Sequence, residues 1–281
     1  MKIFQFASQL NDELNRNKIQ GKKIGFVPTM GALHDGHLSL IQKSQTENDL
    51  TVCSIFVNPT QFNNQEDLIN YPSSNEEDTK LLQEINCDYL YLPNPKDVYP
   101  NGLKTNAFHF GGIENEMEGA KRPGHFDGVA TVVKRLLEIT IPDRAYFGEK
   151  DFQQLQIIKK LVALEHIPCE IIPCAIFREK NGLAMSSRNR RLNPAQLQAA
   201  PAIYQSLVKA KSNFESKTIT ELHEAISLQY KNMDELDLEY FEIADIDTLK
   251  PAKQKEKNKK YRAFIAVFAG SIRLIDNIDL N

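Results

Sequence analysis

Long apolar runs are missing from this 281-residue sequence. A helix that crosses a bilayer needs about 18 or more consecutive apolar residues, and no such run occurs, so we expect no membrane partner. The N-terminal stretch MKIFQF turns polar too soon for a secretory signal. Positive charge is not in excess either, because 34 Lys and Arg stand against 37 Asp and Glu. A formal charge of −3 gives no electrostatic footprint for nucleic acid, so we expect no nucleic-acid partner.

Cysteine is scarce, with Cys53, Cys87, Cys169 and Cys174 as the four in the chain, and no CxxC pair occurs. The histidine and cysteine spacings of zinc sites are also missing. A thiol inside an apolar run usually behaves as a small hydrophobic side chain. We therefore expect buried, reduced thiols in a cytoplasmic protein rather than a zinc site.

Hydrophobic residues make up 41% of the chain, which is enough to bury a core. In the first half, short runs that are apolar throughout predict buried strands, and amphipathic stretches between them predict helices. This alternation indicates a parallel sheet covered on both faces, so we expect a Rossmann-like, doubly wound α/β domain. The expected strands are residues 23–28, 50–57, 88–92, 145–147 and 169–177, and the expected helices are residues 36–43, 76–84, 128–139 and 151–166.

The pattern changes after about residue 176, where helices are followed by adjacent strands, which favours a smaller α+β unit. We therefore divide the chain into a domain of residues 1–176 and a C-terminal α+β lid domain of residues 177–281. The lysine-rich residues 250–260 lack aromatics and are expected to form a solvated loop, with a polyanion-binding patch as the alternative. The expected elements are helices at residues 194–210 and 220–231 and strands at residues 238–244, 262–268 and 272–274.

Candidate functional residues are densest at residues 28–37 (PTMGALHDGH), where the first expected strand meets its helix. Backbone N–H groups at a helix start point at a ligand, and Gly31 and Gly36 allow close approach. His34 and His37 share one helix face, so both can donate to phosphate oxygens and stabilise charge on a leaving group. The alternative is structural, with one histidine capping and one packed. No Walker motif GxxxxGK[ST] occurs.

A second candidate is residues 148–151 (GEKD), where another strand leads into another helix. Lys150 can meet phosphate as a point charge. The two acids beside it would complement a helix N-terminus whatever the function. Gln154 follows one turn later on the same face, and its neighbour Gln153 is expected at the surface.

The third candidate is residues 185–191 (MSSRNRR). Hydroxyl groups followed by guanidinium groups make a flexible anion clasp, in which Arg188 can bind phosphate in a fork. Its position past the expected domain boundary suits a mobile cover over the site, and a solvated polar loop is the alternative.

Weaker candidates follow other strands. Gln61 lies after the second expected strand, at the carboxyl edge where ligands gather, and its amide can donate and accept as a hydroxy acid requires. Residues 71–72 and 122–126 are further candidates to line a pocket, with a plain turn or helix start as the alternative.

Five segments in order carry a family resemblance: PTMGALHDGH, SIFVNPTQF, RPGHFDGVATVV, FGEKDFQQL and GLAMSSRNRRL. With them the sequence resembles the pantothenate synthetase (pantoate–β-alanine ligase) family, adenylate-forming members of the HIGH-signature nucleotidyl transferase superfamily. The resemblance is densest from residue 21 to 192 and fades afterwards until residues 273–277 (RLIDN).

The resemblance implies a two-step reaction. The pantoate carboxylate attacks the α-phosphorus of ATP, which gives pantoyl adenylate and pyrophosphate. The amine of β-alanine then attacks the acyl carbon, which releases AMP and pantothenate. The resemblance also implies Mg²⁺ with the ATP, a homodimer, and nucleotide and pantoate binding by residues 1–176.

Residue by residue, the resemblance gives His37 the position of the proton donor, and the charge of the triphosphate leads us to add His34, Lys150 and Arg188 to the catalytic set. Bringing a carboxylate against a triphosphate needs several cations together, so we expect these groups to converge on one triphosphate. The matched nucleotide contacts are Met30, Gly31, Ala32, Leu33, His34, Asp35, Gly36, His37, Gly148, Glu149, Lys150, Asp151, Phe177, Met185, Ser186, Ser187 and Arg188.

Gln61 matches the residue that holds pantoate and touches β-alanine, and Gln154 matches the second pantoate contact. Arg122 matches a family arginine, and Asp78 matches a carboxylate near the metal.

Two positions depart from the family. Thr60 stands where methionine is usual, and a hydroxyl in an apolar contact needs a partner, so we expect looser pantoate packing. Phe177 replaces smaller aliphatic residues and is expected to contribute its backbone.

Two alternatives stay open. A related nucleotidyl transferase would transfer AMP to a phosphorylated acceptor, which the two glutamines disfavour. A non-catalytic nucleotide- or RNA-binding module is disfavoured by the charge of −3 and by the histidine pair.

Overall fold

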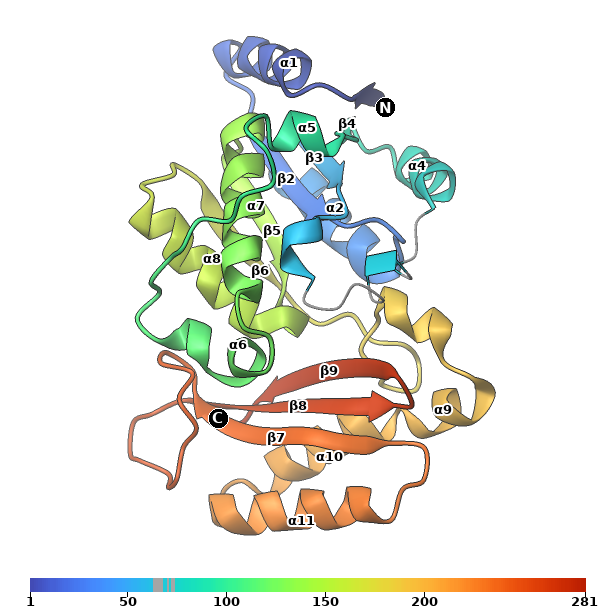
Figure 1. Cartoon of the computed structure of the whole chain (residues 1–281), viewed down its shortest axis with the longest axis vertical. Coiled ribbons are helices and arrows are strands. Elements are labelled where there is room, and N and C mark those ends of the chain that lie inside the picture. Colours follow the sequence, from blue (N-terminus) through green and yellow to red (C-terminus); the bar gives the residue numbers. More distant parts are fainter. Residues whose placement is uncertain (63–67, 70, 72–73) are drawn as a thin grey trace. The chain divides into compact units, whose positions relative to one another are not determined.

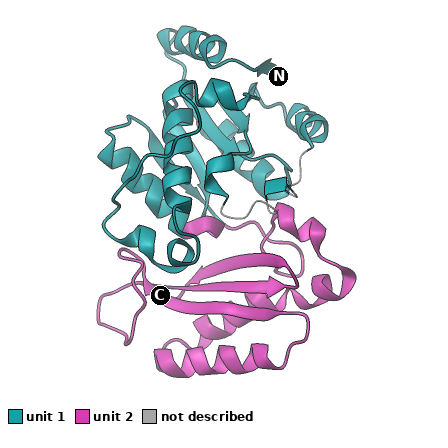
Figure 2. Cartoon of the chain, viewed as in Figure 1, with its two compact units in different colours: residues 1–149, 153–175 teal, residues 150–152, 176–281 magenta. Residues whose placement is uncertain are grey.

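The computed structural model describes residues 1–281 except residues 63–67, 70, 72 and 73, so that one residue of the candidate stretch 71–72 lies outside the described residues. The described chain separates into two compact units (Figure 2). The first contains Met1–Glu149 and Gln153–Ala175, and the second contains Lys150–Phe152 and Ile176–Asn281. The roles that we gave to residues 1–176 and 177–281 stay predictions.

The first unit is built on a parallel sheet, as predicted, and the sheet has six strands (Figure 1), of which the N-terminal strand Lys2–Phe4 was not predicted. The strand order is β1-β4-β3-β2-β5-β6, so the chain moves outward from β2 and then returns to its other side with β5. Ligands of open α/β sheets bind at such a switch point, outside the carboxyl ends of the strands. The strands are β1 (Lys2–Phe4), β2 (Ile24–Thr29), β3 (Leu50–Ile55), β4 (Tyr89–Tyr91), β5 (Arg144–Gly148) and β6 (Glu170–Cys174).

Helices cover both faces of this sheet (Figure 1). On one face, Ile41 and Leu82 pack against the strand residues Val27, Cys53 and Leu90. On the other face lies the long helix of residues 125–140, whose apolar side is almost wholly buried. The helices are α1 (Ala7–Ile19), α2 (Asp35–Glu47), α4 (Asn75–Glu84), α5 (Pro95–Val98), α6 (Met117–Lys121), α7 (His125–Thr140) and α8 (Phe152–Leu164), with short 3₁₀ turns η1 (Pro59–Gln61), η2 (Ile113–Asn115) and η3 (Glu149–Asp151).

The close packing of α2 on β2 depends on Gly25. A Cβ atom there would lie 2.1 Å from Ser44 Oγ, so any other side chain would push the helix away from the strand. Because α2 is held against β2, the start of the helix stays beside the strand's carboxyl end. This arrangement positions the histidine-bearing turn.

The second unit is α+β, as predicted. Its antiparallel sheet has the order β7-β8-β9, and alternate residues of β8 such as Ala263 and Ile265 share a core with Ile203 and Leu207 of a covering helix. Arg262 and Phe264 occupy the other face of the same strand, because side chains alternate along it. The elements are η4 (Ser187–Arg191), α9 (Pro194–Ala199), α10 (Ala202–Asn213), α11 (Ile219–Lys231), β7 (Asp237–Asp245), β8 (Tyr261–Ala269) and β9 (Ile272–Asp279).

Several predicted bounds were wrong. The helix expected at residues 194–210 is two helices, because the chain is interrupted before Pro201, which cannot continue the first helix's hydrogen bonds. β6 ends at Cys174 rather than at residue 177, and β9 continues to Asp279. None of the helices in the described part of the chain is long and apolar enough to cross a membrane.

Candidate active site

The turn between β2 and α2 requires glycine at residue 31. Gly31 and Ala32 have φ angles of 82° and 50°, in the left-handed region. A Cβ atom at Gly31 would lie 2.9 Å from Asp78 Oδ2, so a side chain there would be both strained and crowded. Thr29 Oγ accepts from the Gly31 N–H at 3.2 Å and donates to the Ser54 carbonyl at 2.7 Å. These bonds fix the turn to β3.

Asp78 of α4 holds the same turn from another side. Its side chain is 1% exposed, and its two oxygens accept from the backbone N–H groups of Ala32 and Leu33, each at 2.8 Å. Ser74 Oγ also donates to Asp78 Oδ1 at 3.2 Å. Hydrogen bonds to an ionised carboxylate are strong, so Asp78 is well suited to fix the turn. The position that the resemblance places near a metal therefore has its carboxylate engaged by the backbone.

The histidine pair lies at the start of α2, as the spacing predicts. The His34 carbonyl accepts from the N–H groups of His37 and Leu38 at 2.8 and 3.1 Å, so His34 is the residue from which the helix begins. The two imidazole rings stack with centroids 4.0 Å apart and an angle of 28° between their planes. Both rings are thus fixed together at a helix N-terminus, where an anion is favoured.

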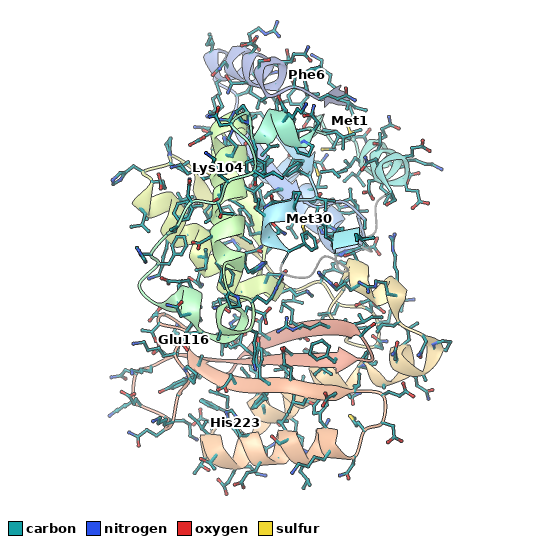
Figure 3. The ribbon with its side chains drawn as sticks, in the orientation of Figure 1. Met1, Phe6, Met30, Lys104, Glu116 and His223 are labelled. Atoms are coloured by element: carbon teal, nitrogen blue, oxygen red, sulfur yellow. The ribbon has the colours of Figure 1, made fainter. Side chains whose placement is uncertain are left out.

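Gln61 lies in η1, immediately after β3, and reaches the histidine-bearing turn. Its side-chain amide contacts the sulfur of Met30, which is labelled in Figure 3. Asn58 Nδ2 lies 3.3 Å from Gln61 Oε1 and orients the amide. The glutamine matched to pantoate and the turn matched to ATP are therefore in contact within the first unit.

The start of α7 fixes the backbone of Gln61. His125 Nδ1 lies 2.8 Å from the Gln61 carbonyl oxygen, and the Arg122 guanidinium donates to the same oxygen at 3.3 Å. A Cβ atom at Gly128 would lie 2.4 Å from the Thr60 carbonyl oxygen, so α7 approaches this segment closely. Arg122 and His125, which we expected to line a pocket, thus make contacts that support Gln61.

Asn58 and Tyr99 support the same segment, and no sequence motif assigned them this role. Asn58 is buried, and its Oδ1 accepts from the Tyr99 hydroxyl at 2.7 Å and from the Thr60 hydroxyl at 3.1 Å. The hydroxyl that replaces the family's methionine therefore has a partner. The position of Asn58 directly after a strand end was the only hint of this role in the sequence. Its partner Tyr99 is far away in the sequence, so no local motif indicates the contact.

Gly148 ends β5, which lies beside β2, so this glycine shares the sheet edge with Met30. A Cβ atom at Gly148 would meet nothing within 4 Å, so the protein's own packing does not require glycine here. Gln154 follows on α8 and is half-buried. The prediction that Gln153 lies at the surface was wrong: it is buried, and its amide donates to the carbonyls of Ile113 and Glu116.

The remaining matched residues belong to the second unit. The Met185 N–H donates to the Phe177 carbonyl at 3.0 Å, so the backbone of Phe177 is engaged in a local hairpin. Phe177 itself is 41% exposed. Ser186 is the N-cap residue of η4, and its Oγ accepts from the Arg188 N–H at 3.3 Å. Lys150 and Asp151 belong to the same unit. The convergence of Lys150 and Arg188 with the histidines on one triphosphate stays a prediction.

The four cysteines are free and buried, which confirms the prediction of buried thiols. Burial raises the pKa of Cys87 and of Cys169 to about 12 and that of Cys174 to about 11. They are therefore protonated thiols at neutral pH and not nucleophiles. Among the described residues, no cluster of three or more His, Cys, Asp or Glu side chains is placed to hold a metal ion.

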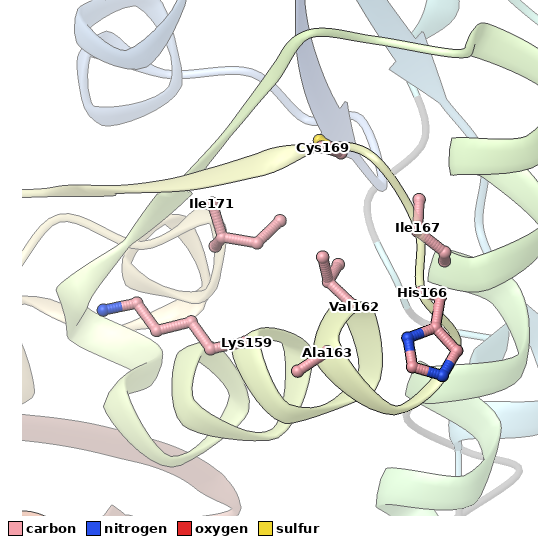
Figure 4. A pocket seen from close by; sticks show the side chains of 7 residues that line it. All are labelled: Lys159, Val162, Ala163, His166, Ile167, Cys169 and Ile171. Atoms are coloured by element: carbon pink, nitrogen blue, oxygen red, sulfur yellow. The ribbon is translucent and has the colours of Figure 1, made fainter.

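A cavity of about 550 Å³ lies between α8 and the edge strand β6 (Figure 4). It includes none of the residues matched to ATP or pantoate. Its lining residues are Lys159, Val162, Ala163, His166, Ile167, Cys169 and Ile171.

The parallel sheet, with a stacked histidine pair at the helix start beside its switch point, defines an α/β nucleotide-binding protein. The family model for pantoate-beta-alanine ligase matches residues 2–279. The chain therefore belongs to the pantoate–β-alanine ligase family.

Curated relatives and solved structures agree with this assignment. The chain is 50% identical to the pantothenate synthetase of Flavobacterium psychrophilum over 281 residues, which covers 100% of both chains. It is similar over 100% of its length to the crystal structure of the Thermus thermophilus pantothenate synthetase (TM-score 0.91, 38% identity, 99% of that chain). It is also similar over its whole length to the Francisella tularensis pantoate-beta-alanine ligase, solved with β-γ ATP and β-alanine (TM-score 0.83, 40% identity, 98% of that chain).

Proposed function

We propose that this chain joins pantoate to β-alanine at the expense of ATP, through a pantoyl adenylate, and releases AMP and pyrophosphate. The contact between Gln61 and Met30 supports this most directly. It places a side chain suited to a hydroxy acid against the turn suited to a nucleotide, as the attack of an acid on ATP requires. Membership of the family, and the relative solved with β-γ ATP and β-alanine, support the same reaction.

Catalysis in this proposal is positioning together with charge neutralisation. Gln61 and Gln154 hold pantoate so that its carboxylate is in line with the α-phosphorus. His37, with His34 beside it, donates its proton to the departing pyrophosphate, and Lys150 and Arg188 neutralise the remaining charge of that leaving group. The buried cysteines are protonated thiols, which fits a direct attack without a covalent enzyme intermediate.

The residues present fit a magnesium ion that arrives with the nucleotide. Mg²⁺ in such sites is bound by one or two carboxylates, waters and substrate phosphates rather than by a protein cage. Asp151 supplies an exposed carboxylate in the same short turn as Lys150, and the described residues contain no cluster of three ligands. When bound, the ion would screen phosphate charge.

We also propose a role for each of the two parts of the chain. Residues 1–176 bind nucleotide and pantoate, and residues 177–281 act as a lid in which residues 185–188 keep water from the adenylate. We further propose a homodimer in the cytoplasm, and light scattering of the purified chain tests the dimer.

Assays in which one substrate is omitted test the reaction. The chain is incubated with ATP, pantoate and β-alanine, or with one of them left out, and AMP, pyrophosphate and pantothenate are measured by mass spectrometry. We expect pantothenate and stoichiometric AMP only when all three are present. Transfer of AMP to a phosphorylated acceptor added in place of pantoate, with no turnover of pantoate, would instead support the related nucleotidyl transferase, and binding of ATP without turnover would support the non-catalytic module.

A further inference from the structure

Two adjacent residues near the end of β9, Asp276 and Asn277, connect to the two segments of the second unit that carry Lys150 and Arg188. They belong to the stretch RLIDN, which the family resemblance marks without a role. Their side chains are 2% and 1% exposed. Successive side chains of a strand point to opposite faces, so each serves a different face of the small sheet.

Asn277 holds the backbone of Lys150. Its Nδ2 donates to the Lys150 carbonyl at 2.9 Å, and its Oδ1 accepts from the Arg262 guanidinium. Arg262 in turn lies over the ring of Phe152, 4.1 Å from its centroid, and that ring also packs at a tilt against Phe264, with ring centroids 6.0 Å apart. The segment of residues 150–152 is therefore held at both ends, since Lys150 is bonded to β9 and Phe152 packs on side chains of β8.

Asp276 holds the other segment. Its carboxylate accepts two bonds from the Arg178 guanidinium, at 2.6 and 3.0 Å, in a bidentate pair. Arg178 also lies over the Tyr204 ring at 3.7 Å. Arg178 pairs with Ala184 in the hairpin that leads to Met185 and Arg188. One strand thus anchors the chain segments of both expected phosphate-binding cations.

A lysine is a point charge on a flexible stem, so its backbone must be fixed if its ammonium group is to meet a developing charge. A misplacement of about 1 Å in a reacting group can reduce a rate by about 100-fold. We propose that Asn277 is a positioning residue that places Lys150 for the triphosphate. This inference rests on the proposed function, and Asn277 acts through Lys150 rather than on the substrate.

The test replaces Asn277 by aspartate. Asn277→Asp preserves the size of the side chain and the oxygen that accepts from the Arg262 guanidinium. It removes the side-chain N–H group that donates to the Lys150 carbonyl. Asn281→Asp is the matched control, because Asn281 Oδ1 accepts from the Tyr261 N–H at 2.8 Å and Nδ2 donates to the Lys259 carbonyl at 3.0 Å. Both substitutions thus remove a donation to a lysine carbonyl, but Asn281 supports the lysine-rich loop.

The rate of pantoyl adenylate formation is measured in single turnovers, with the KM for pantoate and the urea midpoint. We expect Asn277→Asp to lower this rate about 10- to 100-fold, with a pantoate KM within about 3-fold of the wild type. Asn281→Asp should retain the wild-type rate. In a Lys150→Ala background, Asn277→Asp should cause no further loss, because residues that act as a unit are not additive.

A wild-type rate for Asn277→Asp, or losses that multiply in the double variant, would overturn the inference. If Asn277→Asp does not fold, Arg262→Lys carries the same prediction, because it removes the guanidinium that holds both Asn277 and Phe152. A wild-type chain that makes no pantothenate would refute the proposed function, whereas an active wild type with an unaffected Asn277→Asp variant would refute this inference alone.

Discussion

Replacing Asp78 by asparagine should loosen the turn that carries His34 and His37 without changing the volume of the side chain. The carboxylate accepts from the backbone N–H groups of Ala32 and Leu33, one on each oxygen. An asparagine has one side-chain oxygen, so one backbone donor must face the new NH₂ group in either orientation. The substitution therefore removes one hydrogen bond and weakens the other.

The size of this effect follows from the two contacts at 2.8 Å. A hydrogen bond to a charged group contributes about 1.5 to 3 kcal/mol, and a buried donor left without an acceptor costs about 1 to 3 kcal/mol. We expect the free energy of unfolding to fall by about 2 to 4 kcal/mol. Since the turn would then sample other conformations, kcat/KM for ATP should fall by about 10-fold or more.

Asp143→Asn is the matched control, because Asp143 accepts from the Ile24 N–H at 2.9 Å at the opposite end of β2. Urea unfolding and steady-state kinetics in ATP are measured for both variants. Asp143→Asn should lose stability while its kcat/KM for ATP stays within about 3-fold of the wild type, since it lies at the amino edge of the strand. Equal losses of kcat/KM in the two variants would refute a specific role for Asp78 in the turn.

Three further predictions concern the nucleotide. Lys150→Ala should slow adenylate formation by about 100-fold or more in single turnovers, the scale of one lost electrostatic donor, whereas near-normal turnover would contradict a phosphate role. Gly148→Ala should retain the wild-type urea midpoint, because the added Cβ atom meets nothing within 4 Å. The same variant should have a higher KM for ATP, because the methyl group would occupy space that the nucleotide needs beside this backbone. An unchanged KM for ATP would show that the nucleotide does not approach Gly148. EDTA should abolish turnover without changing the melting temperature, because the described residues form no metal cage; a lower melting temperature would reveal a structural metal.

The central strands and the antiparallel sheet could be predicted because their apolar runs are continuous. α1 was not predicted, since it buries Leu10 and Leu14 on an otherwise polar helix whose partner α7 is far along the chain. The helix expected at residues 194–210 was too long because the apolar spacing continues through Pro201 and was given more weight than the proline.

The parts of the site that lie within one segment could be predicted, such as the histidine pair at a helix start. Contacts between segments could not. Asp78 reaches the turn from α4, and Tyr99 reaches Asn58 across a long separation in sequence, so no local spacing reports either contact. Gln153 illustrates the converse: its polar side chain suggests exposure, but carbonyl groups of other elements satisfy it in the interior.

Hydrogen exchange with and without a nonhydrolysable ATP analogue tests most directly whether one triphosphate engages all the expected cations. The account predicts that the analogue protects backbone amides in residues 30–37, 148–151 and 185–188 together, at the same analogue concentration. Protection confined to residues 30–37, with the other two segments unchanged at saturating analogue, would contradict it.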